Sequence, residues 1–198
     1  GAPDGAPGHH TEAQRIEEEE GVEIEFTVFG ANDASEQVTA LQAQMARGMD
    51  GYLISPWRGE ALTPFLEDLR DEGIPVVTHN NLVPGAPQTW VAFDNYNAGV
   101  TAGEAWVAAQ ENLHGEDWAA DGGVVLILRC LITLSADIGR YEGYRSILDP
   151  YLDENPDLKL EVIEAHCDGG DARSAVDDTI SRYGEDEFLG VMSIDGTM

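Results

Sequence analysis

Three polar side chains stand at the end of a short apolar run, IPVVT, in this chain: His79, Asn80 and Asn81. Asp195 follows a further apolar run directly, and Arg140 follows another after one loop and half a helical turn. In an open parallel sheet, ligands bind at the carboxyl ends of the strands. Because amide and guanidinium groups hydrogen-bond to hydroxyl groups, we expect these residues to form a cleft that binds a small polar ligand.

Trp57 is a further candidate, since it follows Ser55-Pro56 at the end of another apolar run. Its flat aromatic face could stack on the apolar face of a ligand, and packing in the core is the alternative. For His79 and Asp195, the sequence likewise leaves open whether the side chain binds a ligand or has a structural role. A histidine among apolar neighbours is commonly a hydrogen-bonded residue at the edge of the core, and an aspartate ahead of Gly-Thr suits a helix N-cap.

Asn80, Asn81 and Arg140 also have structural alternatives. The two asparagines suit a tight turn ahead of the Pro-Gly pair that follows them, and the arginine suits a surface ion pair in so acidic a chain. The position of the asparagines at a strand end favours binding instead. We keep all three as candidate ligand-binding residues, Arg140 because of the family resemblance described below.

No motif for catalysis or metal binding accompanies these residues. The chain has 2 cysteines, Cys130 and Cys167, without CxxC spacing. His9 and His10 resemble a metal-binding pair, but the sequence places no third ligand beside them. The sequence predicts no catalytic residue, no metal site and no cofactor. A disulfide between the cysteines is conceivable, and we expect two free, half-buried thiols instead.

Apolar runs alternate with helical periodicity along the chain. Such alternation is typical of right-handed βαβ units, which build parallel sheets covered by helices on both faces. Strands are predicted at residues 22–29, 51–54, 74–78, 89–93, 123–128, 158–165 and 188–193. Helices are predicted from residue 11 and at residues 35–47, 60–72, 97–113, 135–148 and 171–183.

A break near residues 93–97 divides this series into two parts. We predict an α/β fold of two Rossmann-like lobes with parallel sheets, residues 1–94 and 95–198, and the alternative is a single six-stranded sheet. The chain opens without Met inside a Gly/Pro loop and stops directly after an apolar run. We therefore expect both lobes to be incomplete at these ends.

The charge balance of the chain is extreme, because 38 acidic residues stand against 10 basic ones, for a net charge of −28. We interpret the acids as the solvated surface of a halophilic protein, since such self-repulsion suits strong salt. A calcium store or an acidic tail for a basic partner is the alternative, but the acids are spread along helices rather than clustered. Nucleic-acid binding is disfavoured, because phosphates would meet a repulsive field.

Four segments, taken in order, carry a resemblance to a known family. They are ANDASEQVTALQAQMARGMDGYLISPWRGEALTPFLEDLRDEGIPVVTHNN, VAFDNYNAG, SADIGRYEGYRSIL and VMSIDGTM. The first resembles the first lobe of type I periplasmic sugar-binding proteins, the ribose- and galactose-binding group, and the second resembles the crossover between the lobes. The other two resemble segments of the second lobe. The resemblance covers about residues 12–198 and implies a sugar held between two hinged lobes.

The resemblance also implies roles for particular residues. Asn80 matches the family's acidic ligand in the first lobe and Asn81 the Arg that usually follows it, so both differ from the family and argue against an ordinary aldose such as ribose. Arg140 matches the Arg that holds sugar oxygens from the second lobe. Asp195 stands where the family usually has Asn. Asp94 matches an acidic residue at the crossover, where a hinge role and ligand contact both remain open.

A function follows from the resemblance. It implies that the protein binds a monosaccharide or polyol and delivers it to the permease of an ABC-type importer, on the outer side of the cytoplasmic membrane. A lipid anchor upstream of residue 1 would be the only link to the membrane, and no enzyme activity is expected. The effector-sensing core of a lactose-repressor-type regulator is an alternative, because it shares the same fold. An enzyme on a flavodoxin-like or sugar-isomerase-like fold is a third hypothesis.

Overall fold

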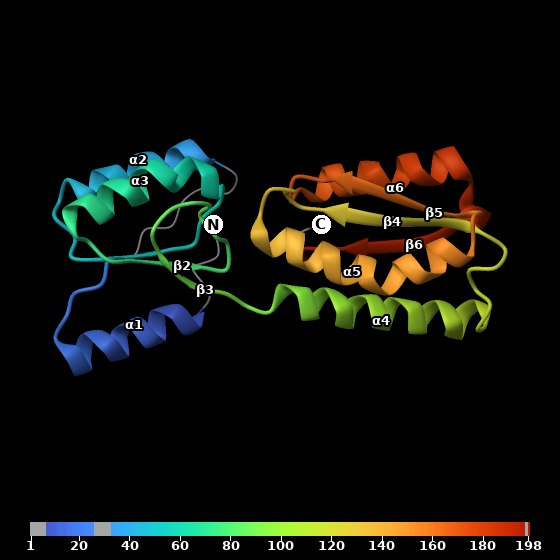
Figure 1. Ribbon diagram of the computed structural model, residues 1–198, viewed down its shortest axis with the longest axis horizontal. Coiled ribbons are helices and arrows are strands. Elements are labelled where there is room, and N and C mark those ends of the chain that lie inside the picture. The colour runs from blue at the N-terminus through green and yellow to red at the C-terminus, as the bar shows by residue number, and fades with distance from the viewer. Residues whose placement is uncertain (1–6, 26–32, 197) are drawn as a thin grey trace.

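The computed structural model describes residues 7–25, 33–196 and 198 and contains two separate three-stranded parallel sheets (Figure 1). The strand order is β1-β2-β3 in the first sheet and β5-β4-β6 in the second. The alternative of a single six-stranded sheet is therefore wrong, and the predicted two-lobed α/β fold is confirmed. The strands are β1 (Tyr52–Ile54), β2 (Val76–His79), β3 (Thr89–Val91), β4 (Gly123–Arg129), β5 (Leu158–Glu164) and β6 (Phe188–Ser193).

Helices separate most of these strands, although β2 and β3 follow each other without one. In Figure 1, α2 and α3 lie on one side of the first sheet, while α4 and α5 lie on one face of the second sheet and α6 lies on the other. The helices are α1 (Pro7–Glu20), α2 (Ala34–Met45), α3 (Gly59–Glu72), α4 (Asn95–His114), α5 (Ser135–Glu154), α6 (Gly169–Tyr183) and the short 3-10 helix η1 (Glu185–Glu187).

One amphipathic helix, α3, holds the first lobe together. Its leucines at helical spacing, Leu62, Leu66 and Leu69, are fully buried. They belong to one core cluster with Leu41 of α2, Tyr52 and Ile54 of β1, and Val76 of β2. α3 ends at Gly73, which has φ 76°, a left-handed conformation that glycine adopts without steric cost. This packing fixes the point at which β2 begins.

The second lobe is built around β4, whose first six residues are all buried. Helices α4 and α5 pack closely beside this sheet, because glycines face each other between them. A Cβ atom on Gly99 would lie 2.1 Å from the backbone oxygen of Arg140, and one on Gly143 would lie 2.3 Å from the backbone oxygen of Tyr96. The small residues that the sequence places along one side of α4 thus bring the backbone of α5 against it.

The link between the lobes runs from β3 to the start of α4 in the described part of the chain (Figure 1). Asp94 caps α4, since its Oδ1 accepts a hydrogen bond from the backbone N–H of Asn97 at 3.0 Å. The cap fixes the direction in which the chain enters the second lobe. Placing the domain boundary between residues 94 and 95 remains an interpretation.

Two local predictions differ from the structure. Residues 22–25 form no regular strand, and the rest of the strand predicted at 22–29 lies outside the described residues. Helix α5 does not end at residue 148 but continues through Pro150. Tyr151 and Leu152 pack against the second-lobe core, and this burial stabilises the last turn despite the proline.

Candidate functional site

A cavity of about 340 Å³ lies where the two lobes meet. The carboxyl ends of β1, β2, β4 and β6 all contribute residues that follow them, as expected for a parallel α/β fold. The lining residues are Ser55, Pro56, Trp57, Asn80, Asn81, Cys130, Leu134, Ala136, Asp137, Arg140, Cys167, Ile194 and Asp195. The structure thus brings together five of the seven predicted site residues.

Asn80 lies directly after β2 with φ 64°, a left-handed conformation that asparagine tolerates better than most residues. Its backbone N–H donates to the Val91 carbonyl at 2.8 Å, which fixes the turn against the end of β3. Its side-chain Oδ1 accepts from the Nδ2 group of Asn95 at 3.2 Å. The turn that the sequence suggested is therefore present, and it is also what directs Asn80 toward the cavity.

Asn81 is buried, with 8% of its surface exposed. Its Nδ2 group donates to the Pro56 carbonyl at 3.1 Å, and its Oδ1 accepts from the backbone N–H of Ala136 at 3.3 Å. Pro56 belongs to the first lobe and Ala136 to the second, so this amide bridges the lobes at the edge of the cavity.

Arg140 reaches the cavity from α5. Its Nε donates to Asn95 Oδ1 at 2.9 Å, and its Nη1 donates to the Ile194 carbonyl at 2.9 Å. These two bonds fix the guanidinium plane between α4 and the end of β6. Planar guanidinium groups hold paired oxygens well, so Arg140 can donate its remaining N–H groups to ligand hydroxyls.

Asn95 connects the polar residues of the two lobes and was missed from the sequence. It is buried, with 7% of its surface exposed, and its side chain links Asn80 to Arg140 through the bonds given above. Its position directly after Asp94, in the segment DNYNAG, was the available signal. Asp94 was the predicted site residue in this segment, but it is the neighbouring Asn95 that makes the hydrogen bond to the other lobe.

Trp57 and Asp195 complete the predicted set in the cavity wall. Trp57 is half-buried, and its backbone N–H donates to Gln37 Oε1 at 3.0 Å. Asp195 follows β6, and its backbone carbonyl accepts from the Ser193 hydroxyl at 2.6 Å. Trp57 also packs against the buried cluster of Cys130, Leu131 and Leu134, so the core packing named as its alternative is present as well.

Asp137 is a second residue that the sequence reading missed. Its carboxylate accepts from Arg129 Nε at 2.7 Å and from the backbone N–H of Cys130 at 2.9 Å. Burial raises the pKa of Asp137, although the adjacent Arg129 favours its charged form. Arg129 also lies 4.2 Å from the ring centroid of Tyr141. This buried pair fixes the loop after β4, which forms the floor of the cavity.

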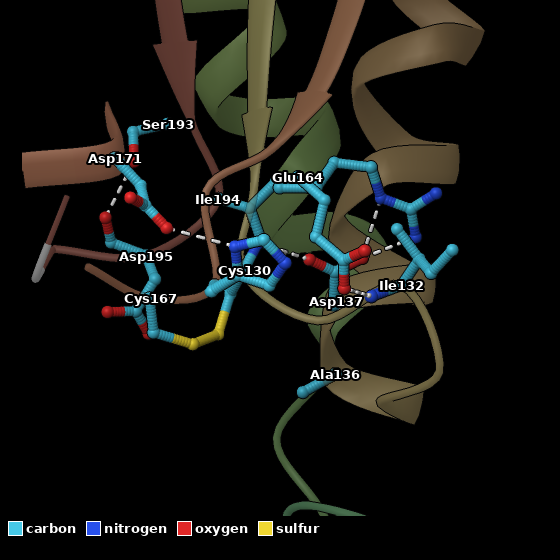
Figure 2. The surroundings of a disulfide bond; sticks show 12 residues. Cys130, Ile132, Ala136, Asp137, Glu164, Cys167, Asp171, Ser193, Ile194 and Asp195 are labelled. Atoms are coloured by element: carbon cyan, nitrogen blue, oxygen red, sulfur yellow. Dashed lines mark hydrogen bonds and ion pairs between the residues drawn. A yellow bond between two sulfur atoms is a disulfide. The ribbon is translucent and has the colours of Figure 1, made fainter. Parts of the chain in front are cut away.

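Cys130 and Cys167 form a disulfide in the cavity wall (Figure 2). The expectation of two free thiols is therefore wrong. The bond joins the end of β4 to the loop between β5 and α6, and the neighbouring strands bring these two ends together. Both cysteines follow predicted strands, so a disulfide was conceivable from the sequence, but only the pairing of β4 with β5 in the sheet brings the two residues together.

His79 and Asp94 lie outside the cavity lining, in contrast to the expectation. Successive side chains on a strand alternate between faces, and His79 is exposed next to the buried Thr78. Asp94 uses both oxygens to cap α4, accepting at Oδ1 from the Asn97 backbone and at Oδ2 from the Asn97 side chain. It lines a separate shallow groove with Phe93 and Asn97.

Chemistry beyond hydrogen bonding has little support in the described residues. Within them, no group of three or more His, Cys, Asp or Glu side chains is arranged to hold a metal ion. The side chains of His9 and His10 lie outside the described part of the structure. None of the described helices combines the length and the apolar character needed to cross a bilayer.

The fold and the cavity define a class of two-lobed α/β binding proteins, in which a small ligand is held between parallel-sheet lobes. Residues 10–198 match the periplasmic binding protein domain family. Because this match covers nearly the whole chain, the chain belongs to that family.

Curated relatives of known name are similar to part of the chain. The chain is 28% identical over 157 residues to the ribose import binding protein RbsB of Bacillus subtilis strain 168, a match covering 71% of this chain and 50% of the relative. It is 24% identical over 150 residues to the D-xylose-binding periplasmic protein of Escherichia coli strain K12, covering 75% of this chain and 42% of the relative. The chain thus spans about half the length of the curated relatives it matches.

Solved structures share the fold. A solute-binding protein of an ABC transporter from Clostridium phytofermentans, with bound β-D-glucose, has a TM-score of 0.77 at 20% identity and covers 94% of this chain and 60% of its own. One from Agrobacterium vitis, bound with α-D-tagatopyranose, has a TM-score of 0.76 at 22% identity and covers 95% of this chain and 62% of its own. At these identities the likeness shows the fold alone.

Proposed function

We propose that this protein captures a monosaccharide or polyol in the cavity between its lobes and delivers it to the permease of an ABC-type importer. The observation that carries the proposal is the cavity itself, because both lobes line it and hydrogen-bonding groups from several strand ends converge there. Lobe closure removes ligand hydroxyls from water. A hydroxyl left without a partner in such a site is costly, so the site discriminates between ligands.

The chemistry of the wall favours a neutral, hydroxyl-rich ligand. Arg140 donates hydrogen bonds, Asp195 accepts them, and the amide of Asn80 offers both kinds of group. The half-buried Trp57 supplies a flat apolar face for the C–H side of a sugar ring. A cationic and an anionic side chain balance each other here, which disfavours a ligand with a large net charge.

The relatives support transport over regulation. The named relatives are an import binding protein and a periplasmic binding protein, and they bind ribose and D-xylose according to their names. By analogy with these relatives, the protein would bind its ligand on the outer side of the cytoplasmic membrane and would not be an enzyme. The difference at Asn80 and Asn81 from the family's acidic and basic pair leaves the identity of the sugar open.

A ligand screen by thermal shift tests the proposal. The panel contains pentoses, hexoses and polyols, with nucleosides and sugar phosphates as opposing classes, and it is run in molar salt because of the net charge of −28. We expect a neutral sugar or polyol to raise the melting temperature by several degrees, as linkage requires. A shift with nucleosides or phosphates only would contradict the proposed ligand class.

Arg140→Ala is the variant that locates the site. Losing hydrogen bonds from a charged donor should weaken binding of the sugar found in the screen by about ten- to a hundredfold, measured by calorimetry. Arg173→Ala removes the same charge from the exposed surface of α6 and serves as the matched control. Equal affinities for Arg140→Ala and the control would place the ligand elsewhere.

A further inference from the structure

The loop after β2 and the amino end of α5 meet across the cleft through two hydrogen bonds. Asn81 Oδ1 accepts from the backbone N–H of Ala136 at 3.3 Å. The backbone N–H of Leu82 donates to the Ser135 hydroxyl at 2.9 Å. Each bond joins a first-lobe residue to a second-lobe residue, so the lobes contact each other directly as well as through any ligand.

Helix α5 has no side-chain cap from its own lobe. Its N-cap position is occupied by Leu134, which makes no side-chain capping bond. By contrast, Asp33 caps α2 and Asp168 caps α6 from the residue directly before each helix. The first N–H groups of a helix need acceptors from outside the helix. The leucine side chain cannot supply one, so an acceptor for these N–H groups comes from solvent or from another part of the molecule.

Asn81 supplies that acceptor from the opposite lobe. An N-cap side chain normally accepts from the second or third N–H group of its helix, and Ala136 is the second residue of α5. The other end of the Asn81 amide is fixed in the first lobe by its bond to the Pro56 carbonyl at 3.1 Å. Because both ends bind protein groups, this side chain has less to offer a ligand than the sequence suggested.

We propose that Asn81 is a positioning residue that caps α5 from the opposite lobe and thereby sets the equilibrium between open and closed forms. The proposal rests on the lobe closure in the proposed function. When the lobes separate, Ala136 loses its acceptor. Removing an N-cap typically shifts stability enough to change an equilibrium by about twofold to thirtyfold, and we expect that range for closure.

Distances between the lobes, measured without any sugar, test the proposal. Spin labels on cysteines introduced at the exposed residues Glu67 of α3 and Asp178 of α6 report the separation by pulsed electron resonance, in molar salt. We expect Asn81→Ala to move the population toward longer distances by about twofold to thirtyfold. Asn81→Asp should keep more of the short distances, since a carboxylate still accepts from Ala136 and suits a helix amino end.

Two further variants separate capping from a general loss of stability. Ser135→Ala removes the acceptor of Leu82 from the second lobe and leaves the Asn81 bond to Pro56 in place, so it should act in the same direction as Asn81→Ala. Asn155→Ala is the matched control. It removes an amide whose bond to the Tyr151 carbonyl, at 2.8 Å, lies within α5 and its cap. We expect this control to leave the distances unchanged.

Unchanged distances in Asn81→Ala would overturn the proposal, even if Ser135→Ala altered them. An equal shift in Asn155→Ala would also overturn it, because the effect would then come from a weakened helix rather than from the lobe contact. A shift limited to the interlobe variants would support it even if no sugar bound in the screen. That last result would contradict sugar capture alone, so the two proposals fail separately.

Discussion

The two lobes differ in how their sheets are covered. In the second lobe, β4 lies between β5 and β6, its first six residues are buried, and helices pack on both faces. In the first lobe, the strands have three or four residues, and Leu53 and Val91 remain 73% and 53% exposed. Parallel sheets are usually covered on both faces. The described residues thus give the cavity one firmly packed wall and one less supported wall.

The lobes also differ in the chemistry that they bring to the cavity. The first lobe contributes two asparagine amides and an aromatic ring, whereas the second contributes Arg140, Asp137, Asp195 and the disulfide. Charged groups need fixed partners when they are removed from water, and the better-packed lobe supplies these partners. Under the proposed function, the second lobe would hold the charged recognition groups in place and the first lobe would close over them.

Core substitutions should expose the difference most strongly. Leu126→Ala, at a fully buried position in β4, should lower the free energy of unfolding by about 2–5 kcal/mol. Leu53→Ala in β1 should change it by less than about 0.5 kcal/mol, because that side chain is 73% exposed. Denaturant titration in molar salt measures both variants. Equal losses would contradict the difference in packing.

Removing the disulfide should lower the free energy of unfolding of the second lobe by as much as Leu126→Ala does, or by less. Replacing both Cys130 and Cys167 by Ala opens a loop of 37 positions, and disulfides of this kind typically stabilise by about 2–4 kcal/mol. Hydrogen exchange should then rise in the loop between β5 and α6 while β1 and β2 stay protected as before. Wild type under reducing conditions is the control and should match the double variant. Faster exchange in the first lobe instead would be evidence against a local role.

The close approach of α4 and α5 predicts a third, smaller effect. A Cβ atom on Gly143 would lie 2.3 Å from the Tyr96 backbone oxygen and 2.6 Å from the Val100 backbone nitrogen. Gly143→Ala should therefore force the helices apart, at a cost of about 1–3 kcal/mol in unfolding free energy. Gly51→Ala in the first lobe is the control, since its nearest atoms are 3.5 Å away. A thermal melt that shows equal stability for both variants would refute the expected strain.

Most of the fold was predictable because its signals are local. The leucines of α3 show helical spacing and Gly73 marks the end of that helix, so neither depends on distant contacts. The failures have a non-local cause. Helix α5 extends past its predicted end because Tyr151 and Leu152 find a buried surface on the second-lobe core.

The candidate site was predictable where strand ends identify it. Asn80, Asn81, Asp195 and Trp57 line the cavity because residues after parallel strands gather at one edge. Arg140 lines it from helix α5. The reading failed for His79, where strand alternation turns the side chain away, and for Asp94, which caps a helix. Whether the lining residues bind a sugar stays a prediction.

The sequence by itself determined the alternation of strands and helices, the two lobes and the set of polar residues at strand ends, because these follow from periodicity and neighbouring residues. Only the tertiary structure decided which polar groups are already engaged. Asn81 and Asn95 form bonds to residues 55 and 45 positions away, Ala136 and Arg140. The disulfide joins residues 37 positions apart. Contacts between residues so far apart in the sequence depend on how the elements and lobes pack, which the local sequence does not specify.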